Sequence, residues 1–325
     1  MSVILVTGGA GFIGSHLCER LLLMGHRVLC LDNFNNTYDP AVKRCNVAKA
    51  LRHSHYRLTE GDILDESLAG GLLESSKADA VVHLAALAGV RRSILAPLDY
   101  VDVDIKGTVS LLEACRKHNV KKFIFASSSS VYGACPSPFR EAAAPGAQIS
   151  PYAAAKRCGE LYCETYSLLY GIRISCLRFF TVYGPRQRPD MAIHTFTKAI
   201  SEGGDIFIYG DGSSSRDYTY VDDIVDGIIA ALDLDRQFEI FNLGNSNTVN
   251  IMSLVEILGN KLGKEVRCRF MPEQQGDAPS TCADIGKAAG LLGYSPKVKL
   301  EEGIERFVAW YANSQKPYSF YPPED

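Results

Sequence analysis

Two residues with complementary acid–base chemistry, Tyr152 and Lys156, stand four positions apart in the run PYAAAK, at the start of an expected helix. Side chains at positions i and i+4 lie on one face of a helix. An ammonium group beside a phenol lowers the pKa of the phenol from about 10, so the phenol can act as a base near neutral pH. A Tyr-x-x-x-Lys pattern also occurs as a solvated surface pair, but here the hydroxyl-rich run SSSSVYG, which contains Ser128, ends an upstream strand. The pair, together with this hydroxyl-rich strand end, predicts a site for proton transfer.

A glycine-rich turn near the N-terminus predicts a dinucleotide site. Gly8, Gly11 and Gly14 form the pattern GxxGxxG between an expected strand and an expected helix. Such glycines allow a tight turn, a close approach of backbone to a pyrophosphate and close packing of helix on strand, and the helix N-terminus stabilises the anion. Asp32 ends the next strand, where a carboxylate binds the ribose 2′-hydroxyl of NAD and repels the 2′-phosphate of NADP. Residues 33–36, NFNN, add no Arg or Lys for such a phosphate, so the sequence predicts NAD.

These residues require a parallel sheet to position them. The expected strands are apolar runs at Val3–Thr7, Arg27–Leu31, Tyr56–Thr59, Ala80–Leu84, Lys122–Ala126 and Arg173–Phe179. The expected helices between them are Phe12–Met24, Val42–Leu51, Leu68–Ser75, Tyr100–His118 and Tyr152–Tyr170. Strands that alternate with helices predict an α/β fold of the Rossmann type, a doubly wound parallel sheet with helices on both faces. Ligands bind such sheets at the carboxyl ends of the strands.

The pattern changes after Gly184. Prolines and a glycine-rich stretch interrupt the alternation, and helices are expected near Ile193–Ser201, Val221–Leu232, Ile251–Leu262 and Ile304–Ala312. We expect an NAD-binding domain over residues 1–180 and a smaller, partly interleaved substrate-binding domain over 181–325. Segments near 215–245 are expected to return to the first domain, because Ile240–Leu243 follows a helix as another strand.

Composition excludes several classes of protein. The 325 residues include 34 basic and 37 acidic side chains, a net charge of −3, which gives no electrostatic basis for binding nucleic acid. No apolar run approaches the ~18 residues of a membrane span, and the N-terminus lacks the basic segment of a signal peptide. The ten cysteines form no CxxC pair, so we expect reduced thiols, a cytoplasmic location and no metal site.

Taken in order along the chain, the motifs resemble those of the extended short-chain dehydrogenase/reductases, and in particular the nucleotide-sugar epimerases and dehydratases. The resembling runs are TGGAGFIGSHL, HLAA at 83–86, SSSSVYG, SPYAAAK, LRFFTVYGPRQRPDM at 177–191, SRDYTYVDD at 215–223 and GDAPSTCADIGKA at 276–288. The run at 177–191 is most similar to UDP-glucuronate 4-epimerases.

The resemblance implies a role for each matching residue. Tyr152 is the catalytic base and acid, Lys156 holds the nicotinamide ribose and lowers the pKa of Tyr152, and Ser128 shares a hydrogen bond with the reacting hydroxyl. The expected NAD-binding residues are Gly8, Gly11, Phe12, Ile13, Gly14, Asp32, Asn33, Asp62, Ile63, Leu84, Ala85, Ala86, Tyr152 and Lys156. The expected substrate-binding residues are Ser128, Ser129, Ser130, Thr181, Arg188, Arg216 and Asp277. Asp62 and Ile63 could equally form an ordinary turn at a strand end, and Arg188 could bind a carboxylate or a phosphate or lie at the surface.

Differences from the family pattern narrow the substrate. Ser129 and Ser130 precede VYG where dehydratases and decarboxylases carry an acidic residue, and Thr181 stands where hexose epimerases usually have Asn. Neutral donors at these positions could hold a substrate carboxylate. Asp104 replaces an Asn of many relatives, and Gln274 replaces a second arginine that binds the diphosphate.

Three activities remain open from the sequence. The first is the 4-epimerisation of UDP-glucuronate to UDP-galacturonate, through oxidation at C4 and return of the hydride to the opposite face. The second is the same reaction on UDP-glucose or UDP-N-acetylglucosamine, and the third is a non-catalytic NAD-binding regulator. Relatives commonly form homodimers through the helices expected at Tyr100–His118 and Tyr152–Tyr170, so a homodimer is expected.

Overall fold

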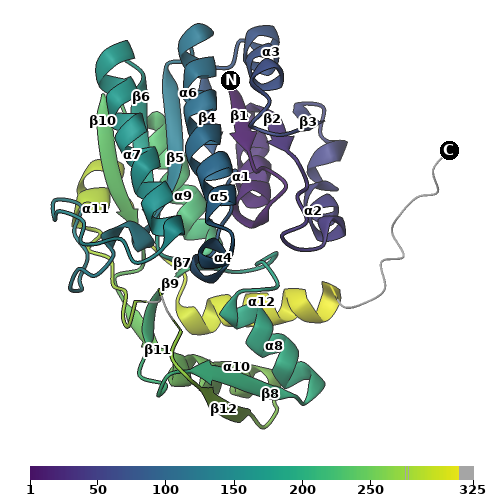
Figure 1. Cartoon of the computed structure of the whole chain (residues 1–325). Coiled ribbons are helices and arrows are strands. Elements are labelled where there is room, and N and C mark those ends of the chain that lie inside the picture. Colours follow the sequence, from purple (N-terminus) through teal and green to yellow (C-terminus); the bar gives the residue numbers. More distant parts are fainter. Residues whose placement is uncertain (275, 277, 315–325) are drawn as a thin grey trace.

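The computed structural model describes residues 1–274, 276 and 278–314. Within these ranges the chain forms a larger lobe around a parallel sheet and a smaller lobe beneath the carboxyl ends of its strands (Figure 1). No helix in the described ranges is both long enough and apolar enough to cross a membrane.

The described part of the larger lobe contains a seven-stranded sheet in the order β10-β6-β5-β4-β1-β2-β3, with every neighbouring pair parallel. Its strands are β1 (Val3–Thr7), β2 (Arg27–Asp32), β3 (Tyr56–Glu60), β4 (Ala80–His83), β5 (Lys122–Ser128), β6 (Arg173–Phe179) and β10 (Phe238–Leu243). The strand order reverses between β1 and β4, which confirms the predicted Rossmann-type fold. At such a reversal the connections leave in opposite directions and open a crevice at the carboxyl ends of the strands.

Helices cover both faces of this sheet, as its apolar strands require. The helices α3 (Glu66–Ser76), α6 (Gly107–Lys117) and α7 (Pro151–Tyr170) cover one face, and α1 (Phe12–Leu23), α9 (Val221–Asp233) and α11 (Gly286–Leu292) cover the other (Figure 1). Successive strand residues alternate between two separate hydrophobic clusters. One cluster contains Leu5, Val81 and Phe123, and the other contains Val6, Val82 and Ile124.

The described part of the smaller lobe contains short strands and three helices. Its strands are β7 (Thr181–Tyr183), β8 (Asp205–Tyr209), β9 (Ser215–Tyr220), β11 (Thr248–Asn250) and β12 (Arg267–Met271), and its helices are α8 (Ala192–Glu202), α10 (Ile251–Leu262) and α12 (Leu300–Ser314). In the described residues β11-β9-β7 form one small sheet and β12-β8 form another. Helix α12 runs across the junction of the two lobes (Figure 1).

The chain passes repeatedly between the lobes. After β6 it enters the smaller lobe through β7, returns along α9 to add β10 beside β6, and leaves again into β11. The strand at 238–243 therefore belongs to the main sheet, in parallel register with β6.

Two predicted helices are interrupted in the structure, and α12 begins four residues before the expected Ile304. The helix expected at Val42–Leu51 is α2 (Pro40–Val47) followed by a 3₁₀ turn, η1 (Ala50–Arg52). Helix α2 begins earlier than expected because the Asp39 side chain caps it and Pro40 fits the first helical position. It ends earlier because the backbone tightens: the Ala48 N–H donates to the carbonyl oxygen of Cys45, three residues before it.

The helix expected at Tyr100–His118 is divided into three parts. It consists of α5 (Pro97–Tyr100), a π-helical turn, η2 (Val101–Lys106), and α6, and it follows the short helix α4 (Val90–Leu95). A π turn holds an extra residue, so hydrophobic periodicity does not reveal it.

The strand β5 also differs from the prediction. It extends two residues beyond the expected Lys122–Ala126, and Ser129–Tyr132 form a 3₁₀ turn, η3.

Candidate active site

A cavity opens where the strand order reverses. Its walls include the glycine loop after β1, Asp32 at the end of β2, the loop after β4 and the first turns of α7. The predicted cofactor residues lie on this cavity with the exception of Asp62. The sheet therefore brings together the two groups of residues that the sequence suggested for dinucleotide binding and proton transfer.

The glycine loop forms a close backbone cradle. Gly8 has φ +68°, and a Cβ atom there would lie 2.7 Å from the backbone nitrogen of Ala85. A Cβ atom at Gly14 would lie 2.2 Å from the Gly8 carbonyl oxygen. Gly11 caps α1 without a side-chain hydrogen bond, so the positive end of the helix faces the cavity without a competing capping group. The loop fits a pyrophosphate, and larger side chains at Gly8 or Gly14 would displace it.

Asp32 is held rigidly on the cavity wall. Its Oδ1 accepts the Phe34 N–H at 2.9 Å and its Oδ2 accepts the Ala10 N–H at 3.0 Å. A carboxylate oxygen accepts more than one hydrogen bond, so both ribose hydroxyls still have acceptors. Sequence reasoning missed Lys43, which also lines the cavity and donates to the Asn35 carbonyl oxygen and to Asn35 Oδ1 at 3.1 and 3.0 Å. Its ammonium is engaged by Asn35, so its presence does not recreate a phosphate site.

Ile63 and Asp62 follow β3 and differ in their relation to this cavity. Asp62 accepts a hydrogen bond from Asn33 Nδ2 at 2.8 Å and another from the Leu64 N–H at 2.9 Å. Asn33 and the buried Ile63 line the cavity, whereas Asp62 does not. Asp62 thus joins the ends of β2 and β3 and orients Asn33.

Helix α7 places Tyr152 and Lys156 on the opposite wall. The helix begins at Pro151, and the Ser150 side chain caps it by accepting the Ala153 N–H. The Lys156 ammonium lies 5.9 Å from the centroid of the Tyr152 ring, and the side chain of Lys156 is 5% exposed. Its nearest anionic partner is Asp104, whose Oδ2 lies 3.7 Å from Nζ. The buried ammonium and the phenol therefore lie on the same wall of the cavity.

The three predicted serines do not share one environment. Ser128 ends β5 and lines the cavity, where its Oγ accepts the Ser130 N–H and donates to Ser130 Oγ at 3.2 Å. Ser129 and Ser130 lie on η3, half-buried and away from the cavity lining. Thr181, on β7, is also half-buried and next to this lining rather than on it.

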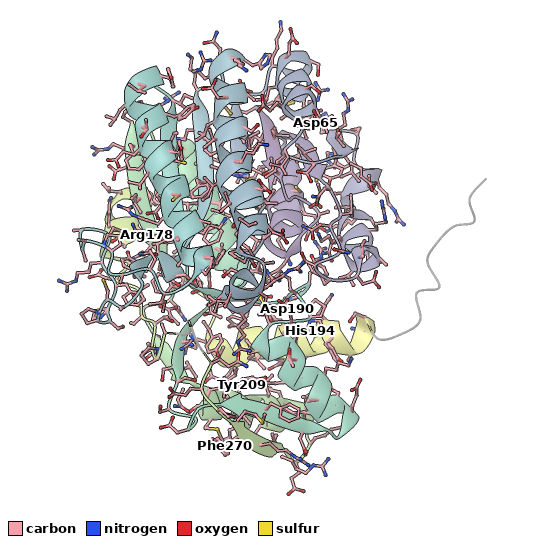
Figure 2. All side chains as sticks on the ribbon, viewed as in Figure 1. Asp65, Arg178, Asp190, His194, Tyr209 and Phe270 are labelled. Carbon is pink, nitrogen blue, oxygen red and sulfur yellow. The ribbon has the colours of Figure 1, made fainter. Side chains whose placement is uncertain are left out.

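Arg188 lies nearer to the cofactor cavity than the sequence indicated. It lines the cavity, pairs with Asp190 at 2.6 Å and donates to the Ala88 carbonyl oxygen at 3.2 Å, so it joins the loop after β7 to the loop after β4. Asp190 lies at the junction of the two lobes (Figure 2). The sequence left three possibilities for Arg188: binding a carboxylate, binding a phosphate, or lying at the surface. These contacts show that Arg188 is not an isolated surface residue.

The residues predicted for the nucleotide half of the substrate lie in the smaller lobe. Arg216, on β9, donates to the carbonyl oxygens of Ser215 and Pro279 at 2.9 and 3.3 Å and does not line the cofactor cavity. Gln274 has a buried Oε1 without a hydrogen-bond partner in the described residues. Asp277 lies outside the described residues.

A buried ion pair behind the catalytic residues was missed by sequence reasoning. Glu160 on α7 accepts two hydrogen bonds from Arg178 on β6, at 2.8 and 2.9 Å, and others from Ser127 at 2.7 Å and Arg157 at 2.8 Å. Arg178 lies between the sheet and α7 in Figure 2. Glu160 follows Lys156 by one helical turn and therefore lies on the same face of α7. This spacing was the one signal in the sequence that the Glu160 side chain faces the sheet. The pair joins α7 to β6, and the hydrogen bond from Ser127 joins the same carboxylate to β5, which ends at Ser128.

Comparison with known proteins agrees with this geometry. The NAD dependent epimerase/dehydratase family matches residues 4–244. A UDP-glucuronate 4-epimerase from Thermodesulfobacterium geofontis is 42% identical over 311 residues, which cover 95% of this chain and 96% of that protein. The crystal structure of a UDP-glucuronic acid 4-epimerase from Bacillus cereus, in complex with UDP-glucuronic acid and NAD, has a TM-score of 0.91 at 39% identity and covers 96% of this chain and 99% of its own. A UDP-glucose 4-epimerase from Thermotoga maritima, with UDP-glucose, has a TM-score of 0.89 at 34% identity, with coverage of 96% and 99%.

Proposed function

This chain belongs to the NAD dependent epimerase/dehydratase family, and on that premise we propose that it interconverts UDP-glucuronate and UDP-galacturonate by inversion at C4. The observation that carries the proposal is that Tyr152, Lys156 and Ser128 lie on one cavity together with the glycine loop and Asp32. A proton acceptor on the same cavity as the glycine loop supports oxidation of the sugar by a bound nicotinamide. The UDP-glucuronate 4-epimerases among its relatives support the choice of substrate.

NAD, when bound, supplies the hydride acceptor for the first half of the reaction and the hydride donor for the second. The Tyr152 phenolate accepts the proton of the C4 hydroxyl and returns it at the end. The Lys156 ammonium stabilises the phenolate, and Ser128 Oγ hydrogen-bonds the reacting oxygen. The 4-keto sugar must turn within the cavity between the two halves, because inversion requires its opposite face to receive the hydride.

A uronate imposes one further requirement on the site. A 4-keto uronate is a β-keto acid, which loses CO₂ when its carboxylate stands perpendicular to the plane of the carbonyl group. Thr181 is a neutral donor next to the cavity lining, and Ser129 and Ser130 are neutral donors that follow Ser128 on η3, outside that lining. We propose that they hold the carboxylate away from that orientation, whereas an acidic side chain there would repel it.

The smaller lobe, with Arg216, is proposed to bind the UDP group, so that residues 1–180 and 181–325 divide cofactor and substrate binding as the sequence suggested. We also propose a cytoplasmic location, since the ten cysteines are free thiols. Cell fractionation with an antibody to the chain would test this.

We propose a homodimer formed through α7 and the neighbouring helices α4 and α5. Large apolar side chains are exposed along this face: Leu95, Leu98, Leu161, Tyr162, Leu168 and Leu169. A patch of this kind on one surface marks an interface more often than a solvated face. Replacement of Leu168 by Asp should shift the sedimentation coefficient to that of a monomer. Leu291→Asp, at an exposed site on α11, should leave the assembly intact, and a monomeric wild-type protein would contradict the proposal.

The substrate is tested with the wild-type protein and three sugars. UDP-glucuronate, UDP-glucose and UDP-N-acetylglucosamine are supplied separately, and the products are identified by NMR. We expect the highest kcat/KM with UDP-glucuronate. A higher kcat/KM with either neutral sugar would favour the alternative, since those epimerases require the same catalytic residues.

A further inference from the structure

A second ionisable group lies behind the catalytic pair. Asp104 is 1% exposed and belongs to the π-helical turn η2, a conformation that is rare and frequent at functional sites. Its Oδ1 accepts the Leu87 N–H at 2.7 Å. Its Oδ2 has no hydrogen-bond partner among the described residues and lies 3.7 Å from Lys156 Nζ. The π turn therefore directs a buried carboxylate at the catalytic ammonium.

The other groups around Asp104 do not neutralise it. On β4, burial and the charge of Lys156 lower the pKa of His83 to about 3, so this imidazole is neutral. On α5, burial, followed by the charge of Asp104, raises the pKa of Tyr100 to about 12. On α7, the Tyr152 ring packs edge-on against Tyr100 at 6.1 Å. Lys156 is thus the cation that faces Asp104 within ion-pair distance in the described part of the chain.

We infer that Asp104 is a positioning residue for this reaction: its ionised carboxylate pairs with Lys156 and sets the pH range over which Tyr152 and Lys156 have the charges that proton transfer needs. This inference rests on the proposed function, in which Tyr152 is the base. Burial raises the pKa of Asp104, while the Lys156 charge and the Leu87 N–H limit that rise. The ion pair keeps the buried ammonium charged and at the same time weakens its effect on the phenol.

The direction of the effect follows from electrostatics. A negative charge raises the pKa of every neighbouring group, whether that group is a phenol or an ammonium. Removing it should therefore lower the pKa of both Tyr152 and Lys156, and both limbs of the pH profile should move to lower pH. At an effective dielectric constant near 20, a unit charge removed at a distance of about 10 Å changes a pKa by about 1 unit, and the change is larger at the 3.7 Å between Asp104 and Lys156.

The test compares two variants with the same change of charge on the same turn. Asp104→Asn removes the buried carboxylate and keeps the acceptor for the Leu87 N–H. Asp102→Asn removes an exposed carboxylate from η2. In NAD-loaded protein, Asp104→Asn should move both limbs of the kcat/KM profile toward acid by at least about 1 pH unit, with the larger shift in the limb set by Lys156, and Asp102→Asn should leave them in place. Asp104→Glu, which keeps the charge, should restore the wild-type limbs, and Asp104→Ser gives a second neutral variant in case the Asn variant does not fold.

A measurement without substrate separates this inference from the proposed function. Protein labelled with ¹³C at the tyrosine ζ carbon is titrated by NMR, and the signal absent from Tyr152→Phe is assigned to Tyr152. A lower titration midpoint in Asp104→Asn supports the inference, even if the panel of UDP-sugars is not epimerised. A midpoint equal to or above that of the wild type, an equal shift in Asp102→Asn, or a profile that only loses height would overturn it.

Discussion

Replacing Glu160 by Gln should destabilise the protein through the buried pair with Arg178. Both side chains are at most 1% exposed, and two hydrogen bonds join them. Gln is nearly isosteric and can keep the hydrogen bond from Ser127. It cannot neutralise the Arg178 guanidinium, whose Nη1 is already buried without a hydrogen-bond partner among the described residues.

The expected loss is about 3–5 kcal/mol, since removing one partner leaves an uncompensated buried charge. With about 2.1 cal/mol/K of unfolding entropy per residue, 325 residues give roughly 0.68 kcal/mol/K, so the Tm should fall by roughly 4–7 °C if unfolding is cooperative. Scanning calorimetry and urea unfolding at pH 7 would measure the loss. Glu164→Gln makes the same chemical change at an exposed site on α7 and should change the Tm by less than about 1 °C.

The pH dependence of this loss is an independent check. Burial raises the pKa of Glu160. The hydrogen bonds and charge of Arg178, together with the hydrogen bonds from Ser127 and Arg157, lower this pKa by a larger amount, so the net shift is downward. A depressed pKa in the folded state contributes stability that is present above the unfolded pKa of about 4.3 and is lost as the pH falls through the folded value. The difference between wild type and Glu160→Gln should therefore shrink below about pH 4. A loss under 1 kcal/mol at pH 7, or one equal to that of Glu164→Gln, would refute the reasoning.

Four further predictions concern the site. Tyr152→Phe should lower kcat by about 10²–10⁴ and keep NAD bound, measured by epimerisation and by cofactor release on denaturation; near-normal turnover would contradict its role as base. The denatured wild type should release NAD(H), and strict dependence on added NADP would contradict the assignment of the carboxylate at the end of β2. Thr181→Val should lower kcat/KM with UDP-glucuronate by about 10- to 150-fold, because it loses a hydrogen bond to a charged group that contributes roughly 1.5–3 kcal/mol. The variant should also release some UDP-pentose. An equal loss of kcat/KM with UDP-glucose would show that the effect of the substitution is structural. Gly14→Ala should lose NAD because its Cβ would lie 2.2 Å from the Gly8 carbonyl oxygen, whereas Gly71→Ala, with nothing within 4 Å, should retain it; equal retention would contradict the cradle.

The features that sequence predicted well are those set within one element. The spacing of Tyr152 and Lys156 is fixed by a single helix, and the glycine turn is fixed by one strand and the helix that follows it. The parallel sheet was also predictable, because strands buried on both faces are continuous apolar runs. Local geometry therefore predicted the fold class and both walls of the cavity.

Contacts between distant elements could not be predicted in this way. The Asp104–Lys156 contact depends on a π turn that periodicity does not show, and the Glu160–Arg178 pair depends on how α7 packs on β6. Arg188 reaches the cofactor cavity from a loop of the smaller lobe, a placement decided by the packing of the lobes. For the same reason the sequence did not separate Ser128, on the cavity, from its two neighbours.

The interleaved path of the chain limits how this enzyme can change its specificity. A fragment that ended after β6 would lack β10 and expose the hydrogen-bonding edge of β6, which promotes aggregation. Among the described residues there is consequently no single linker at which the smaller lobe can be detached and replaced as a unit. New substrates are more accessible through point substitutions in the smaller lobe, and a working chimera would have to exchange the segments on both sides of β10 together.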